Sequence, residues 1–425
     1  MLRMPSPARR QSRRGISSAL ALALALSGGA VIGTVALDAP AHAQDKEKPK
    51  NSKEFATAYQ PVADMVNAED GDLAAAQAKL PDVVSKIEND TDRFFAGNLT
   101  LMLGNKLNDK ALQRQGLKLM VDSGQTSPEQ TAQFQFFIGN LAYDAKDYEA
   151  ARTALLAAKA AGYQDDNLDG LVAETYFTGG DDAAGIDYVT KVANERIAAG
   201  QSVPEQWLLR SLQIAYNASL TDKANDISLL LVQTNPTQKN WLGALQVVAA
   251  LNEMAPPAQL DFLRLMMDTD TLTERREFVQ YIEAADPRIM SNEVARVLDA
   301  AVEAGELATT DQYYADVKRV VDQREGEDAS DAPELEKEAR AAADGAAGVT
   351  AGDVYLSLAN YPKAEEMYQL AVDKGGTDAN LALTRLGIAQ VRQGKFDEAK
   401  ATFGKVTGDR ELLAKLWTAY ADSKA

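Results

Sequence analysis

Residues 351–403 decide the fold: AGDVYLSLANYPKAEEMYQLAVDKGGTDANLALTRLGIAQVRQGKFDEAKATF. The stretch holds two similar units whose matching residues lie 35 positions apart. Each unit places a small residue in a first helix, an aromatic residue in a tight turn, an alanine in a second helix and a further aromatic residue after it. Self-similarity at this period predicts stacked two-helix units. The matching pairs are Gly352 with Gly387, Tyr361 with Phe396, Ala364 with Ala399, and Tyr368 with Phe403.

Earlier parts of the chain repeat this pattern less strictly. Gly139 and Ala151 occupy the small positions of one unit, and Gly185 follows Ala151 by 34 residues. Ala224 and Ala258, also 34 apart, begin weaker units. The period resembles that of the tetratricopeptide repeat, and the small residues would let paired helices approach within backbone contact. The resemblance implies a solenoid in which the first helix of each pair lines a concave groove.

Capping residues delimit helices outside the clearest units as well. The segment Ser127 to Gln130 offers a capping box with a proline in the first turn, and a helix then runs to about Asp144. Glycines such as Gly162 and Gly305 follow helical stretches, where a left-handed residue closes the last turn. We find no strand-like alternation in the sequence. We therefore predict an all-α fold, an α-solenoid of roughly ten or eleven stacked helix-turn-helix pairs of tetratricopeptide type.

Changes in composition divide the chain into segments. We expect a disordered start over residues 44–52 and a helical array over residues 53–323. Residues 324–332 are acidic and carry no large apolar side chain, which predicts a solvated linker. Pro333 is expected to open the next helix, and residues 333–425 to form a C-terminal pair of repeats.

The first 43 residues have the pattern of an export signal. Five arginines precede an apolar run, which ends in Ala41-His42-Ala43, so we expect cleavage after Ala43 to leave Gln44 first. The alternative is an uncleaved membrane anchor, since the run is long enough to span a bilayer. Arg13-Arg14 fits a twin-arginine signal poorly, which favours ordinary secretion. We predict an exported protein of a Gram-negative periplasm, without stable membrane insertion once the signal is removed.

Charge and residue content exclude several classes of function. Cleavage would reduce the 44 basic residues by five arginines to 39 and the 62 acidic residues by Asp38 to 61, a formal charge of −22. A field of this sign disfavours nucleic acid and anionic lipid as partners. The chain has no cysteine, and its one histidine, His42, lies in the signal segment. Thiol or imidazole chemistry, disulfides and cysteine or histidine zinc sites are therefore not expected.

Motifs that would indicate catalysis are missing from the sequence. It contains no nucleophile elbow, dinucleotide-binding glycine pattern or phosphate loop, so we predict no catalytic residue, cofactor or metal site. Residues 165–170 mimic half of a calcium loop, but Tyr176 stands where glutamate is needed, and we interpret the segment as the cap of the following helix. Paired carboxylates can hydrolyse glycosides without histidine, so one alternative is a peptidoglycan-active enzyme or its accessory. A purely structural spacer is a further alternative.

The candidate site is a set of amide and aromatic side chains on the first helices, at the positions that the resemblance assigns to the groove. An amide both donates and accepts, which suits an extended peptide backbone, and aromatic rings supply contact area. We therefore predict a non-catalytic scaffold of the cell envelope that binds a protein or an extended peptide. The alternative is that the aromatic rings only seal the packing between adjacent helix pairs. The predicted groove residues are Gln133, Phe136, Asn140, Tyr143, Asn167, Glu174, Phe177, Gln206, Leu209, Gln213, Tyr216 and Asn217.

Overall fold

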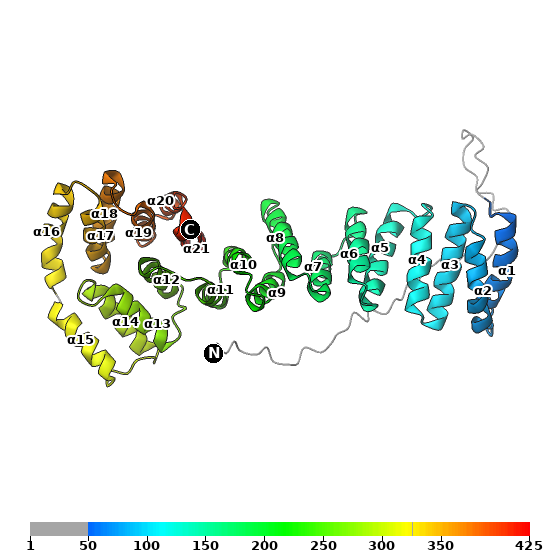
Figure 1. The fold of residues 1–425 in the computed structure, drawn as a ribbon, viewed down its shortest axis with the longest axis horizontal. Helices are drawn as coiled ribbons and strands as arrows, with labels where there is room; N and C mark the ends of the chain where they lie inside the picture. Colours follow the sequence, from blue (N-terminus) through cyan, green and yellow to red (C-terminus); the bar gives the residue numbers. More distant parts are fainter. Residues whose placement is uncertain (1–49, 325) are drawn as a thin grey trace. The chain divides into compact units, whose positions relative to one another are not determined.

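The computed structural model describes residues 50–324 and 326–425. The predicted signal segment, its cleavage point at Ala43 and Gln44, and residues 44–49 lie outside this part. Across the described residues every regular element is helical, with 21 consecutive α-helices and one short 3-10 helix (Figure 1). Neighbouring helices pack pairwise, which confirms the all-α helical-repeat fold. Among these residues no helix combines the length and the hydropathy needed to cross a membrane.

The N-terminal part, which we call the open array, comprises α1 to α9. The main contacts of each helix are with helices one or two positions away along the chain, as expected for a solenoid. Its helices are α1 (Lys53–Asn67), α2 (Leu73–Ser85), α3 (Asp90–Leu107), α4 (Lys110–Asp122), α5 (Pro128–Asp144), α6 (Tyr148–Ala160), α7 (Leu168–Gly179), α8 (Asp182–Ala198) and α9 (Glu205–Asn217).

The C-terminal part, which we call the closed array, comprises α10 to α21. Here helices distant in sequence also touch: α21 packs on α10 and α12, α12 on α19, and α14 on α17. Its elements are α10 (Thr221–Thr234), α11 (Gln238–Leu251), α12 (Pro256–Asp268), α13 (Arg275–Ala285), α14 (Ser291–Glu303), α15 (Gln312–Arg324), α16 (Glu327–Ala341), α17 (Ala346–Ser357), α18 (Tyr361–Lys374), α19 (Ala379–Val391), α20 (Phe396–Phe403), η1 (Gly408–Arg410) and α21 (Glu411–Lys424).

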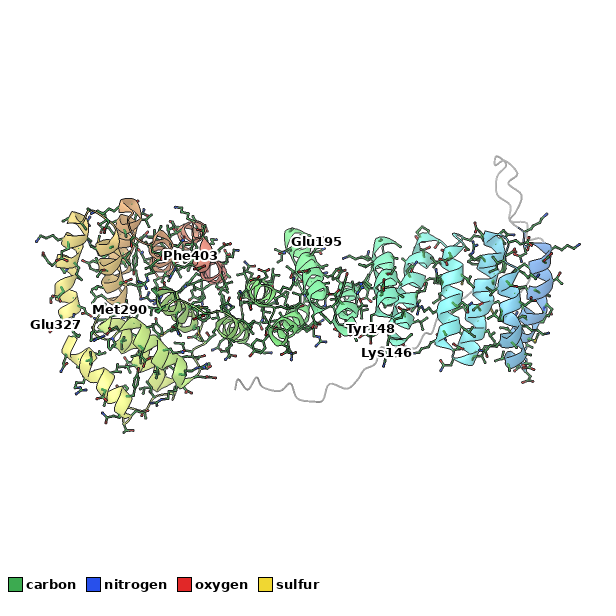
Figure 2. The ribbon with its side chains drawn as sticks, viewed as in Figure 1. Lys146, Tyr148, Glu195, Met290, Glu327 and Phe403 are labelled. Carbon is green, nitrogen blue, oxygen red and sulfur yellow. The ribbon has the colours of Figure 1, made fainter. Side chains whose placement is uncertain are left out.

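One turn recurs between the two helices of a pair and fixes the register of the repeat. A residue in the left-handed conformation follows the first helix, and the next residue is the N-cap of the second. After α5, for example, Lys146 has φ 62°, and the N–H of Asp147 then donates to the carbonyl of Ala142, which satisfies the helix end. Lys146 and Tyr148, labelled in Figure 2, flank this N-cap. The left-handed residues are Asn108, Lys146, Gly180 and Ser219 in the open array, and Ala359 and Gly394 in the closed array.

Small residues allow the close helix approach that the repeat pattern predicts. A Cβ added to Gly139 would lie 2.7 Å from Cγ of Leu155, and one added to Gly387 would overlap the ring of Phe403. The matching alanines Ala151, Ala224, Ala364 and Ala399 are fully buried, whereas Ala258 is only half-buried. Helix packing therefore requires the small residues of the clearer units but not Ala258.

The expected disordered start is too long by at least two residues. Ser52 caps α1, because its side chain accepts from the N–H of Phe55. The Ser52 N–H in turn donates to the Asp92 carboxylate of α3 at 2.9 Å. Asp92 is fully buried, so this bond ties the beginning of α1 to the second pair.

The predicted acidic linker over residues 324–332 is wrong. α16 begins at Glu327, labelled in Figure 2, and Pro333 lies inside the helix instead of opening it. Asp328 is only 2% exposed, and its carboxylate accepts from the hydroxyl of Ser291 at the first turn of α14 and from Arg324. An acidic residue that caps a distant helix end is stabilised by that helix, and local composition cannot reveal it.

The predicted C-terminal pair over residues 333–425 also differs from the structure. This region contains α17 to α21 and most of α16. Its buried apolar side chains belong to a single cluster that runs from Val232 to Ala421, so no domain boundary falls at the acidic segment. The distant contacts of α12 and α21 produce this continuity.

Candidate functional site

All the predicted groove residues except Asn217 fall at equivalent places when they are counted back from the left-handed turn residue of each pair. Positions 13, 10, 6 and 3 residues before that turn recur on α5, α7 and α9. We call this set the first-helix face. Its members are Gln133, Phe136, Asn140 and Tyr143 on α5, Asn167, Gly170, Glu174 and Phe177 on α7, and Gln206, Leu209, Gln213 and Tyr216 on α9.

Every predicted groove residue is at least partly accessible. Gln133, Asn167, Gln206, Gln213 and Asn217 are exposed, and the others are half-buried. The first-helix face of the open array thus meets solvent, although several of its side chains also contact neighbouring helices.

Four of the predicted residues line one pocket of about 240 Å³ between α7 and α9. Asn167, Glu174 and Phe177 reach it from α7, and Gln206 reaches it from α9. The other pocket residues are Gly170, Leu171, Ala173, Val189, Trp207 and Arg210. We call this site the α7–α9 pocket.

Two glycines make room for the aromatic walls of the α7–α9 pocket. A Cβ on Gly170 would lie 2.5 Å from Nε1 of Trp207, so only glycine lets this indole approach α7. A Cβ on Gly185 of α8 would overlap the ring of Phe177. The repeat pattern identified Gly185, and the structure shows that it positions a pocket wall.

Polar contacts join α7 to α9 across the pocket. Arg210 donates through Nη2 to Oε1 of Glu174 at 3.3 Å, and its guanidinium lies 6.0 Å from the centre of the Phe177 ring. Nε1 of Trp207 donates to Oδ1 of Asn167 at 3.3 Å. The pocket therefore combines two aromatic walls, amides and one partly exposed ion pair, so its net charge is zero.

Asn167 occupies the N-cap position of α7, but its side chain does not cap the helix. Its amide oxygen accepts from Trp207 instead, while its backbone N–H donates to Asp165 at 2.7 Å. The calcium-like segment is therefore a turn that leads into a helix. Among residues 50–324 and 326–425, no three histidine, cysteine or acidic side chains are grouped to hold a metal ion.

The α5 aromatics also contact residues in or just before the neighbouring helix pair. Phe136 stacks on Tyr163 with ring centroids 4.4 Å apart, and Tyr143 contacts the hydroxyl of Thr178 at 3.0 Å. Gln213 and Asn217 on α9 are exposed but do not line the pocket. The site brought together by the structure is thus smaller than the predicted groove and centred on α7 and α9.

The predicted groove did not include six of the pocket residues, among them Gly170, Trp207 and Arg210. Counting back from the turn would have placed Gly170 level with Phe136 and Arg210 next to Leu209.

A second polar cluster lies buried in the closed array. Asp261 of α12 is fully buried and accepts from Arg264, Arg385 and Arg410. Burial alone would raise the pKa of Asp261, but the three guanidinium groups outweigh it and hold the pKa below its usual value. Tyr368 of α18 completes the cluster by donating to Asp353, the second carboxylate on Arg385.

The same cluster extends to α14. Glu293 receives Nε and Nη2 of Arg264, each at 2.8 Å, and the hydroxyl of Tyr281 at 2.8 Å. Burial opposes its ionisation, yet Arg264 and Tyr281 lower the pKa of Glu293 to about 2. Each carboxylate of the cluster is therefore matched by guanidinium groups, which offsets the cost of burying charge.

Comparison with known proteins adds little to this description. No family model and no curated protein matches the chain. Among solved structures, the Naa15/Naa10 complex bound to HypK-THB aligns with 13% identity and a TM-score of 0.29 over 85% of this chain. The chain spans 65% of the length of that protein. A circular tandem repeat protein aligns with 12% identity and a TM-score of 0.14, over 87% of this chain and 96% of its own. Because these TM-scores are low, the evidence for the helical-repeat fold is the pairwise packing of the helices in this chain.

Proposed function

We propose that the chain is a non-catalytic scaffold of tetratricopeptide type, which binds a protein or peptide on the first-helix face of the open array. One observation carries this proposal: Asn167, Glu174, Phe177 and Gln206, chosen by repeat register, converge on a single accessible pocket. We further propose that the protein acts in the periplasm after cleavage between Ala43 and Gln44, and that it uses no cofactor.

The size of the pocket supports a macromolecular ligand. Pockets for whole small molecules measure roughly 300–1,000 Å³, and the α7–α9 pocket measures about 240 Å³. It has room for a side chain of a larger partner. The exposed amide of Gln206, which lines the pocket, and that of Gln213, further along α9, can meet the polar groups of that partner.

Peptide-display selection against the purified protein tests the proposal. Peptides enriched on the wild-type chain should lose at least about ten-fold in affinity when Asn167 and Gln206 are both replaced by alanine, since about 1.4 kcal/mol of contact energy is tenfold in affinity. The matched control replaces Asn194 and Gln233, an exposed asparagine and glutamine on the second helices α8 and α10. Binding should survive in the control.

The outcomes separate the three candidate functions. Peptides that bind both double variants equally would remove the pocket from the proposal. An absence of enriched peptides would favour a spacer. Turnover of peptidoglycan fragments by the purified chain would favour an envelope enzyme. Mass spectrometry of the exported chain tests the signal separately, with Gln44 expected as the first residue.

A further inference from the structure

We propose that the ligand of the α7–α9 pocket is a helical segment carrying a carboxylate between apolar side chains, and that this carboxylate binds Arg210. The inference rests on the proposed function and names the chemistry of the partner. It follows from an internal precedent, because the closed array already holds such a segment at the equivalent place.

The two places are equivalent by repeat register. Glu174 lies six residues before the left-handed Gly180, and Asp353 lies six residues before the left-handed Ala359. Each carboxylate pairs with an arginine of the next first helix. These arginines, Arg210 and Arg385, each lie nine residues before the next left-handed residue, Ser219 and Gly394 respectively.

In the closed array, α12 occupies this place. Nη1 of Arg385 donates to Asp353 at 2.5 Å, while its Nε donates to Asp261 of α12 at 3.2 Å. Leu260 and Phe262, on either side of Asp261, are 2% and 3% exposed. The chain itself thus places an aspartate-bearing helix with apolar neighbours against the first helix α19, where Asp261 meets Arg385 and a second carboxylate, Asp268, pairs with Arg392.

In the open array the same arginine faces solvent. The side chain of Arg210 is 50% exposed, and a guanidinium carries five N–H donors, of which the Glu174 bond uses one. Phe177 and Trp207 supply apolar walls beside it. A carboxylate brought by a partner would give Arg210 two acceptors, as Asp353 and Asp261 give Arg385 two.

The opposite charge would not be recognised in the same way. A cationic side chain entering the pocket would compete with Arg210 for Glu174, the one acidic side chain that lines the pocket. An uncharged helix would gain the aromatic walls but would leave the remaining donors of Arg210 without a charged acceptor. Charge-assisted hydrogen bonds are about twice as strong as neutral ones, so the carboxylate should contribute most of the specificity.

A fluorescent peptide of residues 255–269, which spans α12, is a suitable probe for the full chain. We expect its affinity to fall about ten-fold when the peptide carries Asp261→Asn, or when the protein carries Arg210→Ala. The two changes should not add, because each removes the same carboxylate–guanidinium contact. Arg276→Ala, at an exposed arginine of α13, is the matched control in the protein and should leave binding unchanged.

Equal binding of the two peptides would overturn the inference, and so would equal binding to wild type and Arg210→Ala. The latter result would also arise if the peptide only displaced α12 from the closed array. Selected peptides that need Asn167 and Gln206 but carry no carboxylate would uphold the proposed function while contradicting this inference.

Discussion

The open and closed arrays build the same first-helix face and place it in different surroundings. In the open array the face meets solvent and carries amides and half-buried aromatics, such as Asn140, Gln213 and Tyr216. The equivalent positions of α17 and α19 include Leu356 and Ile388, which are 4% and 0% exposed. The repeat therefore determines which positions lie on the first-helix face. Whether such a position holds a polar or an apolar residue depends on whether it meets solvent or another helix.

Closure of the second array depends on charge as well as on apolar contact. Asp261, Glu293 and Asp353 are neutralised by Arg264, Arg385 and Arg410, which come from four different helices and η1 between them. Such a network is neutral overall, but the loss of one member leaves unpaired charge in a dry interior. The open array has no equivalent network among its described residues, so four experiments can separate the two arrays.

Asp261→Asn should produce the largest difference in stability between the closed and the open array. It would leave three arginines with one carboxylate fewer, and breaking a buried pair costs about 3–5 kcal/mol. Amide hydrogen exchange should speed up across α12 to α21 and remain unchanged across α1 to α6. Glu195→Gln, at an exposed ion pair, is the control and should affect neither array. Uniform loosening of the whole chain would show that the arrays are not energetically distinct.

Acidification should destabilise the closed array next most strongly. The folded-state pKa of Glu293, about 2, lies below its ordinary value of 4.5, so its stabilising effect exists above pH 4.5 and is lost as the pH falls toward 2. Linkage gives a loss of roughly 2 kcal/mol by pH 3 from this group. Asp268, whose pKa is raised by burial, opposes part of that loss. Hydrogen exchange at pH 6 and pH 3, corrected for intrinsic rates, would check it. A larger loss in α1 to α6 would contradict the prediction.

Two glycines at the same repeat position sharpen the comparison. Gly387→Ala would press on Phe403, whose ring stacks with Trp417 and cannot yield, and we expect a loss of about 2 kcal/mol. Gly139→Ala would meet the end of the more adaptable Leu155 side chain, and the gain in helix propensity of up to about 1 kcal/mol offsets part of the strain. Urea unfolding of the two variants should therefore give different midpoints. Equal losses would show that local packing is the same in both arrays.

The substitutions with the smallest expected effect on stability should act equally in the two arrays. Lys146 and Ala359 adopt φ 62° and 57° in the same exposed turn. Replacing either by glycine should relieve the left-handed strain and stabilise the protein by about 0.5–1 kcal/mol. Thermal unfolding would measure both gains. Because the turn is a local structure, unequal gains would indicate that surroundings influence it.

Local signals explain how much of the fold could be predicted. The small residues at Gly139 and Gly387, the capping box at Ser127 and the helix-ending glycines act within one helix pair, and all were located from the sequence. The contacts between distant helices of the closed array could not be predicted, because Asp261 pairs with Arg385 and Arg410, which lie 124 and 149 residues away in the sequence. Asp328 was misjudged for the same reason, since the helix it caps begins 37 residues earlier.

The site could be predicted only in part. Repeat register selected Asn167, Glu174 and Phe177, because they occupy one face of a helix with a clear turn. Trp207 and Arg210 lie one residue after Gln206 and Leu209, so they fall outside the positions that the repeat register selects on α9. Their part in the pocket depends on contacts with Asn167 and Glu174 of α7, which the repeat register does not show.

Cysteine accessibility tests the central claim most directly, because the chain has no cysteine of its own. Asn140 and Ile388 occupy the same position, six residues before the left-handed turn, in the open and closed arrays. We predict that a thiol introduced by Asn140→Cys reacts with a small disulfide reagent at a rate typical of folded, accessible sites. A thiol introduced by Ile388→Cys should react only through unfolding. Similar rates at the two positions in the folded protein would contradict the distinction between an open and a closed first-helix face.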